Sequence, residues 1–377
     1  MGSKIAMLNA GLSEAIDSTL KVGPARFVDL FSGSGAVARW VAVNYALPVE
    51  AVDTQEYAKV LSGAIIERNE KASASVLNDW IMASHDMYLS RSSDFELNND
   101  GQFSSAAVYA ERDKARFIDT PGFVARQYGG HYYSLKQGIA FDCLLECLPP
   151  SAAERSVALA AVIESASSCA ASPGHTAQPF QPSTNLVKHI ESAWKRDPFA
   201  FVARKADSFA ARYALSSGGR AWRADALGYV RDMLPENSVV FCDPPYSEVQ
   251  YSRFYHVLEG IAVGGWQDVH GAGRAPSGEH RFSSAFSSRK DSSAAFSDLF
   301  QALAAKSATV ILTFPNHDCS NGQSSEALRL LAHPWYEVAI TSVEVTHSSL
   351  GASEISGGGR VPRKNVKESV MVLSPIR

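Results

Sequence analysis

The stretch RFVDLFSGSG, residues 26–35, indicates how this chain folds. Its apolar run is bounded by a Gly-Pro pair and a Ser-Gly pair, which is typical of a short buried strand between two turns. Residues 36–45 then have helical composition, and residues 48–53 form a second apolar run that ends in Asp53. Residues 55–69 again have helical composition. This alternation predicts a βαβ unit with a glycine turn after its first strand.

Further strand patterns lie in the last part of the chain. We expect strands at residues 221–223, 238–242, 308–314, 337–346 and 368–373. Between some of them we expect helices near residues 251–263, 293–306 and 324–333. Strands that alternate with helices predict an α/β fold built on a layered sheet.

The interval between these two parts has a different pattern. It shows no convincing strand alternation, and we expect helices near residues 75–90, 139–147, 154–168 and 185–215. The sequence therefore predicts a mainly helical domain at 71–214, inserted into a sheet domain made of residues 1–70 and 215–377. The segment 264–292 is rich in Gly, Ser, Arg and His, and a loop of this length is usually functional or disordered.

The composition excludes several classes of protein. With 377 residues, 46% hydrophobic and 20% charged, the chain resembles an average soluble protein of two or three domains. It has no run of about 18 apolar residues, so we expect no membrane span, and its first 20 residues lack a signal peptide's apolar core. The five cysteines include no CxxC pair, which indicates reduced thiols, no metal site and a cytoplasmic location. A net charge of −4 leaves nucleic-acid binding to local basic patches.

The glycine turn is the first candidate for binding chemistry. Gly33 and Gly35 allow a backbone to approach a nucleotide-like ligand closely, although GxG turns are common. Asp53 is expected at the carboxyl end of the neighbouring strand, where an acid can bind ribose hydroxyls. An acid at the N-terminus of the following helix is the alternative interpretation of Asp53.

The second candidate is the tetrapeptide DPPY, residues 243–246, which directly follows the expected strand 238–242. Its two prolines fix the backbone and remove two N–H donors, so the turn is stiff. Asp243 and Tyr246 are then expected at the carboxyl end of the strand, where open α/β sheets bind ligands. A carboxylate and a carbonyl can accept both N–H bonds of an aromatic amino group while Tyr246 stacks on the ring. A purely structural turn is the alternative.

A glycine motif after a strand, a long insertion and then DPPY resembles the S-adenosylmethionine-dependent adenine-N6 DNA methyltransferases. The order resembles in particular the deoxyadenosine methylases of restriction–modification and phage systems. Three further stretches agree with this family, namely GSK at residues 2–4, GGHYYS at 129–134 and ADA at 224–226.

The resemblance implies a fold. It is a Rossmann-like methyltransferase fold with a mixed, mostly parallel sheet whose final strand is antiparallel. Residues 343–346 and 368–373 would supply the last hairpin, and the helical domain at 71–214 would be the target-recognition domain.

The resemblance also implies a reaction, which is site-specific transfer of a methyl group from S-adenosylmethionine to the N6 amino group of a flipped-out adenine. The partner is double-stranded DNA, no metal is required, and a cognate restriction endonuclease would act separately. The implied catalytic residues are Asp243, Pro244, Pro245 and Tyr246. The implied cofactor-binding residues are Lys4, Asp29, Phe31, Gly33, Gly35, Asp53, Asp225 and Asp243.

DNA contacts are expected from two regions. In the insertion the candidates are Arg126, His131 and Tyr133. Near the catalytic edge the candidates are Arg253, Arg274, Arg281, Arg289, Lys290, Arg360, Arg363 and Lys364. Tyr132 and Tyr133 could equally be core aromatics, and Lys4 could belong to a solvated terminus.

Two other functions remain open at this point. An RNA adenine-N6 methyltransferase is the first, because a DPPY pocket reads the base and does not by itself distinguish the sugar. The second is a catalytically silent DNA-binding protein on the same fold. The intact DPPY and glycine motifs favour an enzyme over the silent protein.

Overall fold

The computed structural model describes residues 3–93, 103–119, 122–278, 282–348 and 363–376. The chain divides into two compact units. Residues 1–69, 213–251 and 282–377 form the first unit, which we call the sheet unit. Residues 70–212 and 252–281 form the second, which we call the helical unit.

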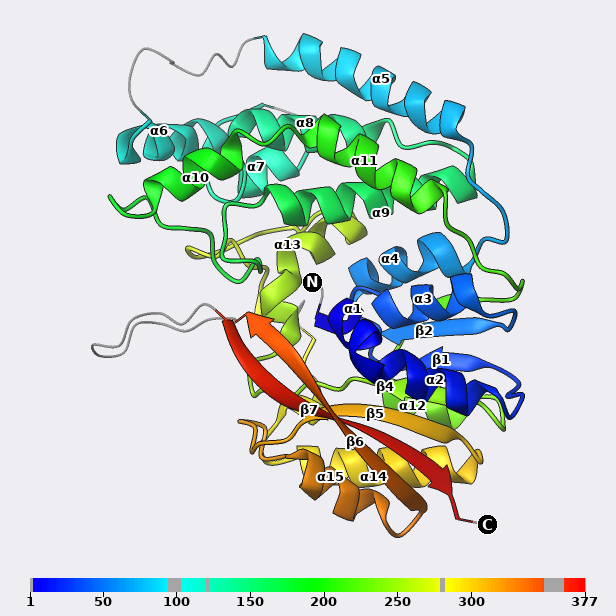
Figure 1. Cartoon of the computed structure of the whole chain (residues 1–377). Helices are drawn as coiled ribbons and strands as arrows, with labels where there is room; N and C mark the ends of the chain where they lie inside the picture. Colours follow the sequence, from blue (N-terminus) through cyan, green and yellow to red (C-terminus); the bar gives the residue numbers. More distant parts are fainter. Residues whose placement is uncertain (1–2, 94–102, 120–121, 279–281, 349–362, 377) are drawn as a thin grey trace. The chain divides into compact units, whose positions relative to one another are not determined.

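The described strands of the sheet unit form one seven-stranded sheet in the order β3-β2-β1-β4-β5-β7-β6 (Figure 1). Their bounds are β1 Phe27–Asp29, β2 Val49–Asp53, β3 Arg220–Arg223, β4 Val239–Cys242, β5 Thr309–Pro315, β6 Tyr336–Ser348 and β7 Arg363–Pro375. The first five pair in parallel, and β7 runs antiparallel between β5 and β6. This mixed, mostly parallel sheet confirms the predicted α/β, Rossmann-like fold class.

The final hairpin is longer than the sequence predicts. Cross-strand pairing continues from Tyr336 opposite Pro375 to Ser348 opposite Arg363. Residues 363–367 read RKNVK, and this polar run hid the first part of β7 from a search for apolar alternation. Backbone pairing with β6 extends the strand where side-chain pattern alone does not.

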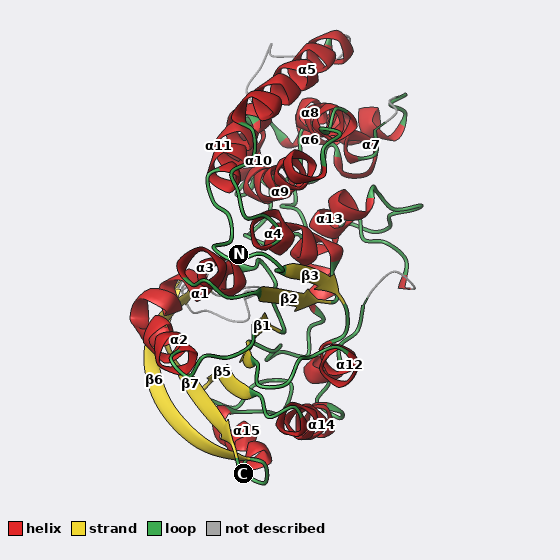
Figure 2. Cartoon of the chain, turned by 90° about the vertical axis from the view of Figure 1, so that its right-hand side faces the viewer, coloured by secondary structure: helices red, strands yellow, loops and turns green. Residues whose placement is uncertain are grey.

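Helices cover both faces of the sheet (Figure 2). One face carries α1 Ser3–Met7, η1 Leu8–Leu12, α2 Ser13–Leu20, α3 Ala36–Asn44 and α4 Glu56–Ile66, which share a buried apolar cluster with β1 and β4. The other carries α12 Ala226–Asp232, α14 Ser292–Ala305 and α15 Ser325–Ala332, together with the short turn η3 Ala285–Ser287. Because β1, β4 and β5 lie buried between these two layers, their sequences are mostly apolar.

The three N-terminal helical segments were not predicted from the sequence. They are short, and Gly11 interrupts them with φ +120°, so they lack the long periodic pattern that identifies a helix. Their helical form depends on packing, since Met7, Leu12 and Ile16 are fully buried against the sheet. This packing brings the first residues of the chain to the sheet.

The helical unit is built from α5 to α11 and α13. Their bounds are α5 Ala74–Ser92, α6 Ser105–Arg116, α7 Val124–Tyr128, α8 Leu135–Glu146, α9 Ala152–Cys169, α10 Val187–Trp194, α11 Pro198–Ala210 and α13 Tyr251–Val263. The sequence predicted one helix over 185–215, but the structure has two. Asp197 caps the second by accepting a hydrogen bond from Phe199 N at 2.9 Å, and Pro198 occupies its first turn.

Residues 252–281 group with the helical unit, whereas the pattern of strands and helices predicted that they belong to the sheet domain. Their contacts account for the grouping. The Tyr132 hydroxyl donates to Gly273 O at 2.9 Å, and Arg274 Nε donates to Gln127 O at 2.7 Å. A side chain at Gly265 would overlap the ring of Phe123. The segment is thus held by long-range contacts that its own sequence does not indicate.

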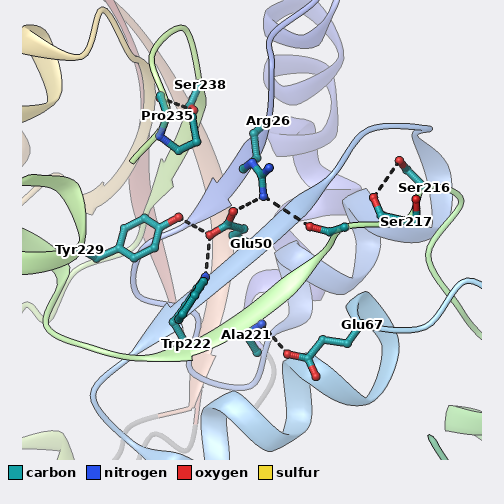
Figure 3. A network of polar contacts seen from close by, with 11 residues as sticks. Arg26, Glu50, Glu67, Ser216, Ser217, Ala221, Trp222, Tyr229, Pro235 and Ser238 are labelled. Atoms are coloured by element: carbon teal, nitrogen blue, oxygen red, sulfur yellow. Dashed lines mark hydrogen bonds and ion pairs between the residues drawn. The ribbon is translucent and has the colours of Figure 1, made fainter. Parts of the chain in front are cut away.

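The buried carboxylate of Glu50 links three parts of the sheet unit by hydrogen bonds (Figure 3). Glu50 of β2 accepts hydrogen bonds from Arg26, from the Tyr229 hydroxyl and, at 2.6 Å, from Trp222 Nε1. These donors come from the start of β1, from α12 and from β3. Because each donor is matched to the same carboxylate, the network fixes how β3 leads into α12.

Candidate active site

The predicted site residues follow four neighbouring strands. Asp29 ends β1, Asp53 ends β2, Asp225 follows β3 and Asp243 follows β4. These strands are parallel, so their carboxyl ends lie at one edge of the sheet. We call this place the acidic edge.

Lys4 lies at the acidic edge. Its Nζ is 2.8 Å from Asp243 Oδ1 and 3.2 Å from Glu368 Oε2, and its side chain is only 14% exposed. Lys4 therefore does not lie in a solvated terminus, which was the alternative interpretation of its sequence. Burial acts to lower the pKa of Lys4, but the two carboxylates outweigh it and the pKa is raised. Lys4 is therefore held as a cation between two acids.

The two oxygens of Asp243 have different surroundings. Oδ1 lies against Lys4 Nζ and also accepts the Thr313 hydroxyl at 2.9 Å. Oδ2 accepts no hydrogen bond from the residues that the structure describes, and the side chain is 25% exposed. Burial raises the pKa of Asp243 and the nearby Glu368 adds to this, while Lys4 opposes it. One oxygen is fixed, and the other is left for a ligand.

Glu368 is a site residue that the sequence pattern did not indicate. It lies on β7 opposite Pro315 and is 1% exposed. A lone Glu at the first position of the expected strand 368–373 reads as solvent-facing, so nothing in the local pattern predicts its burial. Only the insertion of β7 beside β5 brings Glu368 to Lys4.

The buried side-chain amide of Asn321 is hydrogen-bonded to the DPPY turn. Asn321 Nδ2 donates to Pro245 O and to Phe286 O, both at 3.0 Å. Asn321 is fully buried, and its Oδ1 accepts the backbone N–H of Gln323 at 3.2 Å. These bonds hold the turn after β4, the loop after β5 and η3 together. The signal available in the sequence was weak, because an Asn before Gly322 reads as an ordinary turn.

The two glycines of the turn after β1 have different tasks. Both have positive φ, +49° at Gly33 and +70° at Gly35. A Cβ on Gly35 would overlap the Ser62 hydroxyl and lie 3.1 Å from Ser62 Cα, so α4 packs against this position. A Cβ on Gly33 would meet nothing nearer than Phe31 O at 4.0 Å. Gly35 is required by packing, whereas Gly33 leaves open space beside the backbone.

Asp53 fastens the glycine turn to α4. Its Oδ2 accepts the Gly33 N–H at 2.9 Å and its Oδ1 accepts the Gln55 N–H at 3.0 Å. The second bond matches the helix N-terminal role that the sequence left as an alternative. Asp53 thus lies at the carboxyl end of β2, directly beside the glycine turn.

Asp29, like Glu368, is 1% exposed. Its Oδ2 accepts the Ala38 N–H at 3.2 Å, and its buried Oδ1 has no hydrogen-bond partner among the described residues. Burial, with smaller contributions from Asp243 and Asp53, raises the pKa of Asp29 to about 8. Asp29 therefore keeps its proton at neutral pH in the ligand-free state.

The other predicted cofactor residues have structural partners of their own. The ring of Phe31 packs edge-on against Phe286 with centroids 5.2 Å apart. Asp225 is exposed and caps α12, since its Oδ2 accepts the Gly228 N–H at 3.0 Å. Tyr246 is half-buried and packs against the apolar cluster that includes α14.

One predicted DNA contact is corrected by the structure. Tyr133 is fully buried, and its hydroxyl donates to Ala166 O at 3.1 Å within the helical unit. Tyr132 is equally buried. Both are core aromatics, the alternative that their sequence had left open. A side chain with no exposed surface cannot read a base edge.

The remaining DNA candidates are dispersed. Arg126 is exposed on α7, His131 is half-buried beside it, and Arg253 is exposed on α13, all in the helical unit. Arg289 and Lys290 are exposed in the sheet unit. Arg363 and Lys364 begin β7, and their side chains lie outside the described part of the structure. Arg281 and Arg360 also lie outside the described residues.

The described helices include none that is long and apolar enough to cross a membrane. The described residues also bring together no group of three or more His, Cys, Asp or Glu side chains suited to hold a metal ion.

Residues 224–311 match the sequence family described as D12 class N6 adenine-specific DNA methyltransferase. The matched segment contains Asp225, β4 and the whole DPPY turn. A search of curated proteins found no match. The family match confirms the resemblance that the order of the motifs indicated.

Proposed function

We propose that this chain is an adenine-N6 DNA methyltransferase, a proposal supported by its motif order, its sheet and the match over residues 224–311. The reaction is transfer of the methyl group of S-adenosylmethionine to N6 of an adenine in double-stranded DNA, at a specific sequence. We further propose that the modification belongs to a restriction–modification or phage system, with any endonuclease acting as a separate protein.

The acidic edge has the chemistry to hold this cofactor. S-adenosylmethionine supplies a methyl group activated by a positively charged sulfonium, and it also carries a cationic amino group. Five carboxyl groups lie here, those of Asp29, Asp53, Asp225, Asp243 and Glu368, and Lys4 is paired with only the last two. The buried, unpartnered Oδ1 of Asp29 is the strongest sign, because a cation near it would favour the ionised form.

Neighbouring positions would hold the uncharged parts of the cofactor. The open space beside Gly33 admits a ligand against the backbone. Asp53, at the carboxyl end of β2, would accept ribose hydroxyls, and Phe31 offers an aromatic edge to the adenine ring. Asp225, at the N-terminus of α12, would accept a hydrogen bond from the cofactor's adenine, in keeping with the family resemblance.

Asp243 would act on the target base. Its Oδ1 is fixed by Lys4 and Thr313, so the direction of Oδ2 is fixed as well. Oδ2 and the Pro244 carbonyl would accept the two N–H bonds of the adenine amino group and leave its lone pair directed at the methyl group. Positioning of this kind is sufficient for catalysis, because the methyl group is already activated. The raised pKa of Asp243 also suits Oδ2 to take the proton that N6 loses.

The base must leave the duplex to reach this edge. Enzymes that act on a base within a duplex extrude it into a pocket. Tyr246 would stack on the extruded adenine, a contact worth about 1–3 kcal/mol. Asn321 would hold the turn that carries Tyr246 through its bond to Pro245 O.

The observation that carries this proposal is the asymmetric hydrogen bonding of Asp243. The test is transfer of tritiated methyl from S-adenosylmethionine to unmethylated duplex DNA, with N6-methyladenine identified in the digested product. Asp243→Ala should lower turnover at least 100-fold and leave most of the DNA affinity, because phosphate contacts supply most non-specific affinity. Thr313→Ser is the matched control, since it keeps the hydroxyl on Oδ1 and should keep activity.

Three results would contradict the proposal. They are absence of N6-methyladenine in the wild-type reaction, turnover of Asp243→Ala within about tenfold of wild type, a difference of ~1.4 kcal/mol, or preference for a matched RNA over DNA. Single-molecule sequencing of host DNA after expression would then give the recognition sequence.

A further inference from the structure

Two arginines of the helical unit are anchored to the same short turn. The Arg112 Nε donates to Gly130 O at 2.8 Å, and the Arg274 Nε donates to Gln127 O at 2.7 Å. Arg112 comes from α6, which lies beside α7 (Figure 1), and Arg274 comes from the loop after α13. Segments far apart in the sequence thus place two guanidinium groups at residues 127–131, which we call the arginine turn.

The backbone of this turn is built for close approach. Gly130 has φ +69°, and a Cβ there would lie 2.7 Å from Arg112 Cα. Only glycine lets α6 pack this closely onto the turn. Arg274 itself has φ +51°, a conformation that non-glycine residues rarely adopt, and its hydrogen bond to Gln127 helps to hold it.

The positive charge of Arg112 and Arg274 at the arginine turn is not balanced by a described carboxylate, although the Arg112 guanidinium lies over the Tyr109 ring, 5.5 Å from its centroid. Neither Arg112 nor Arg274 forms a salt bridge within the described residues, and the buried Nη2 of Arg112 has no hydrogen-bond partner there. Burial lowers the pKa of both groups. Arg116 adds a third cation, exposed and 3.4 Å from Asp113. The nearby Glu111 is directed elsewhere, since it accepts the Leu135 N–H at 2.7 Å.

His131, which lies within the arginine turn, is also affected by the charges of these arginines. Its Nδ1 is buried and has no hydrogen-bond partner among the described residues. Burial first, and then the charges of Arg112, Arg274 and Arg116, lower the pKa of His131 to about 3. His131 is therefore a neutral imidazole surrounded by cations, with donor and acceptor capacity that the protein does not use.

We propose that Arg112, Arg274 and Arg116, with His131 between them, form a binding site for a phosphate group of the DNA backbone. This inference rests on the proposed function for the identity of the polyanion. Half-buried guanidinium groups without a carboxylate are costly unless a ligand supplies the missing charge. Phosphate does so with a geometry that guanidinium groups match in bidentate fashion. The site positions the duplex and does not read its sequence.

The test is the salt dependence of binding to a fluorescent DNA duplex. Arg112→Gln and Arg274→Gln should each weaken binding and reduce the slope of log K against log salt, by about 0.9 for one lost phosphate contact. Arg91→Gln is the matched control in the same unit, because Glu146 pairs with Arg91 through two hydrogen bonds of 2.7 and 2.9 Å. Its slope should equal that of the wild type.

Two further measurements separate this site from a structural role. Arg112→Lys and Arg274→Lys restore the charge and should recover most of the slope. The ring signals of His131 in NMR spectra should shift when the duplex is added to wild type and shift less in the Gln variants. Wild-type slopes in both Gln variants, or an unchanged His131 signal in wild type, would overturn the proposal.

The outcome is also separable from that of the proposed function. Methyl transfer is measured on the same preparations at saturating DNA, with Arg91→Gln as the variant that should retain wild-type turnover. If the Gln variants show the expected change in slope relative to the wild type, but the wild type transfers no methyl group, the proposed reaction is wrong and the phosphate site stands. If methyl transfer is present and the slopes do not differ, only the phosphate site is lost.

Discussion

The acidic edge and the arginine turn both hold charged groups away from water, but the charges are of opposite sign and the protein accommodates them differently. At the acidic edge, carboxyl groups outnumber the single lysine paired with them, and one of them, Asp29, responds by keeping its proton. At the arginine turn, arginine cannot give up its charge, so the neighbouring His131 stays neutral and the guanidinium groups bond to backbone carbonyls. Excess charge of either sign marks a place where a ligand of the other sign completes the balance.

The difference between the regions predicts separable effects of mutation. Changes at the acidic edge should alter catalysis and cofactor affinity while leaving the salt dependence of DNA binding unchanged. Changes at the arginine turn should do the reverse. Substitutions of Lys4, the two turn glycines and Asp29 probe the acidic edge, in decreasing order of expected effect.

Lys4→Met should have the largest effect. It leaves Asp243 and Glu368 buried near each other without their cation, and breaking a buried ion pair in this way costs about 3–5 kcal/mol. The pKa of Asp243 should rise further, so turnover near pH 7 should fall at least 100-fold and its optimum should move to higher pH. Turnover against pH and thermal unfolding measure both effects.

Adding Glu368→Gln to Lys4→Met removes one of the two opposed carboxylates and should recover part of the lost stability. The DNA salt slope of both variants should match the wild type. A Lys4→Met enzyme with normal turnover would show that Lys4 does not orient Asp243.

The two glycines give the next prediction, because they separate packing from ligand approach. Gly35→Val should destabilise the protein by about 2–4 kcal/mol, since its side chain meets Ser62 and its φ is positive. Gly33→Ala should cost about 1–2 kcal/mol from φ alone, yet weaken cofactor binding more, because its Cβ occupies open space. Chemical unfolding and calorimetric titration with S-adenosylmethionine compare the two. Equal cofactor affinity in Gly33→Ala and wild type would make this turn purely structural.

Asp29→Asn tests the protonated acid and has the smallest expected effect. In the folded protein Asp29 keeps its proton up to about pH 8, whereas the unfolded chain loses it near 3.8. The unfolded state therefore binds fewer protons between these values, so this residue lowers stability as the pH rises across that window, and the full cost remains above pH 8. The Asn variant has no such cost, so its stability should not fall between pH 5 and pH 8 as that of the wild type does.

The same variant should bind S-adenosylmethionine more weakly, because it cannot ionise beside a cation. Unfolding curves at pH 5 and pH 8 and a titration at pH 8 provide the comparison. A stability difference between variant and wild type that is the same at pH 5 and pH 8 would show that Asp29 is ionised in the free protein.

Much of the fold was accessible from local sequence. The strands around residues 27–29, 49–53 and 239–242 were predicted within one or two residues, because a short apolar run between turn residues is typical of a buried strand and of little else. The order of the glycine turn and DPPY then indicated the family. The elements that were missed are those whose pattern is weak, such as the N-terminal helices broken at Gly11 and the polar first part of β7.

The α/β class, and the choice of Asp243, Gly33 and Lys4 as site residues, followed from the order of the amino acids along the chain. What those residues contact followed only from the folded chain. Glu368 reaches Lys4 because β7 inserts beside β5, Asn321 supports Pro245 from a loop 76 residues away, and Tyr133 is core rather than surface. The physical reason is that backbone pattern is set by neighbours in sequence. Burial, hydrogen-bond partners and charge balance are set by neighbours in space, and those are brought together only when the whole chain folds.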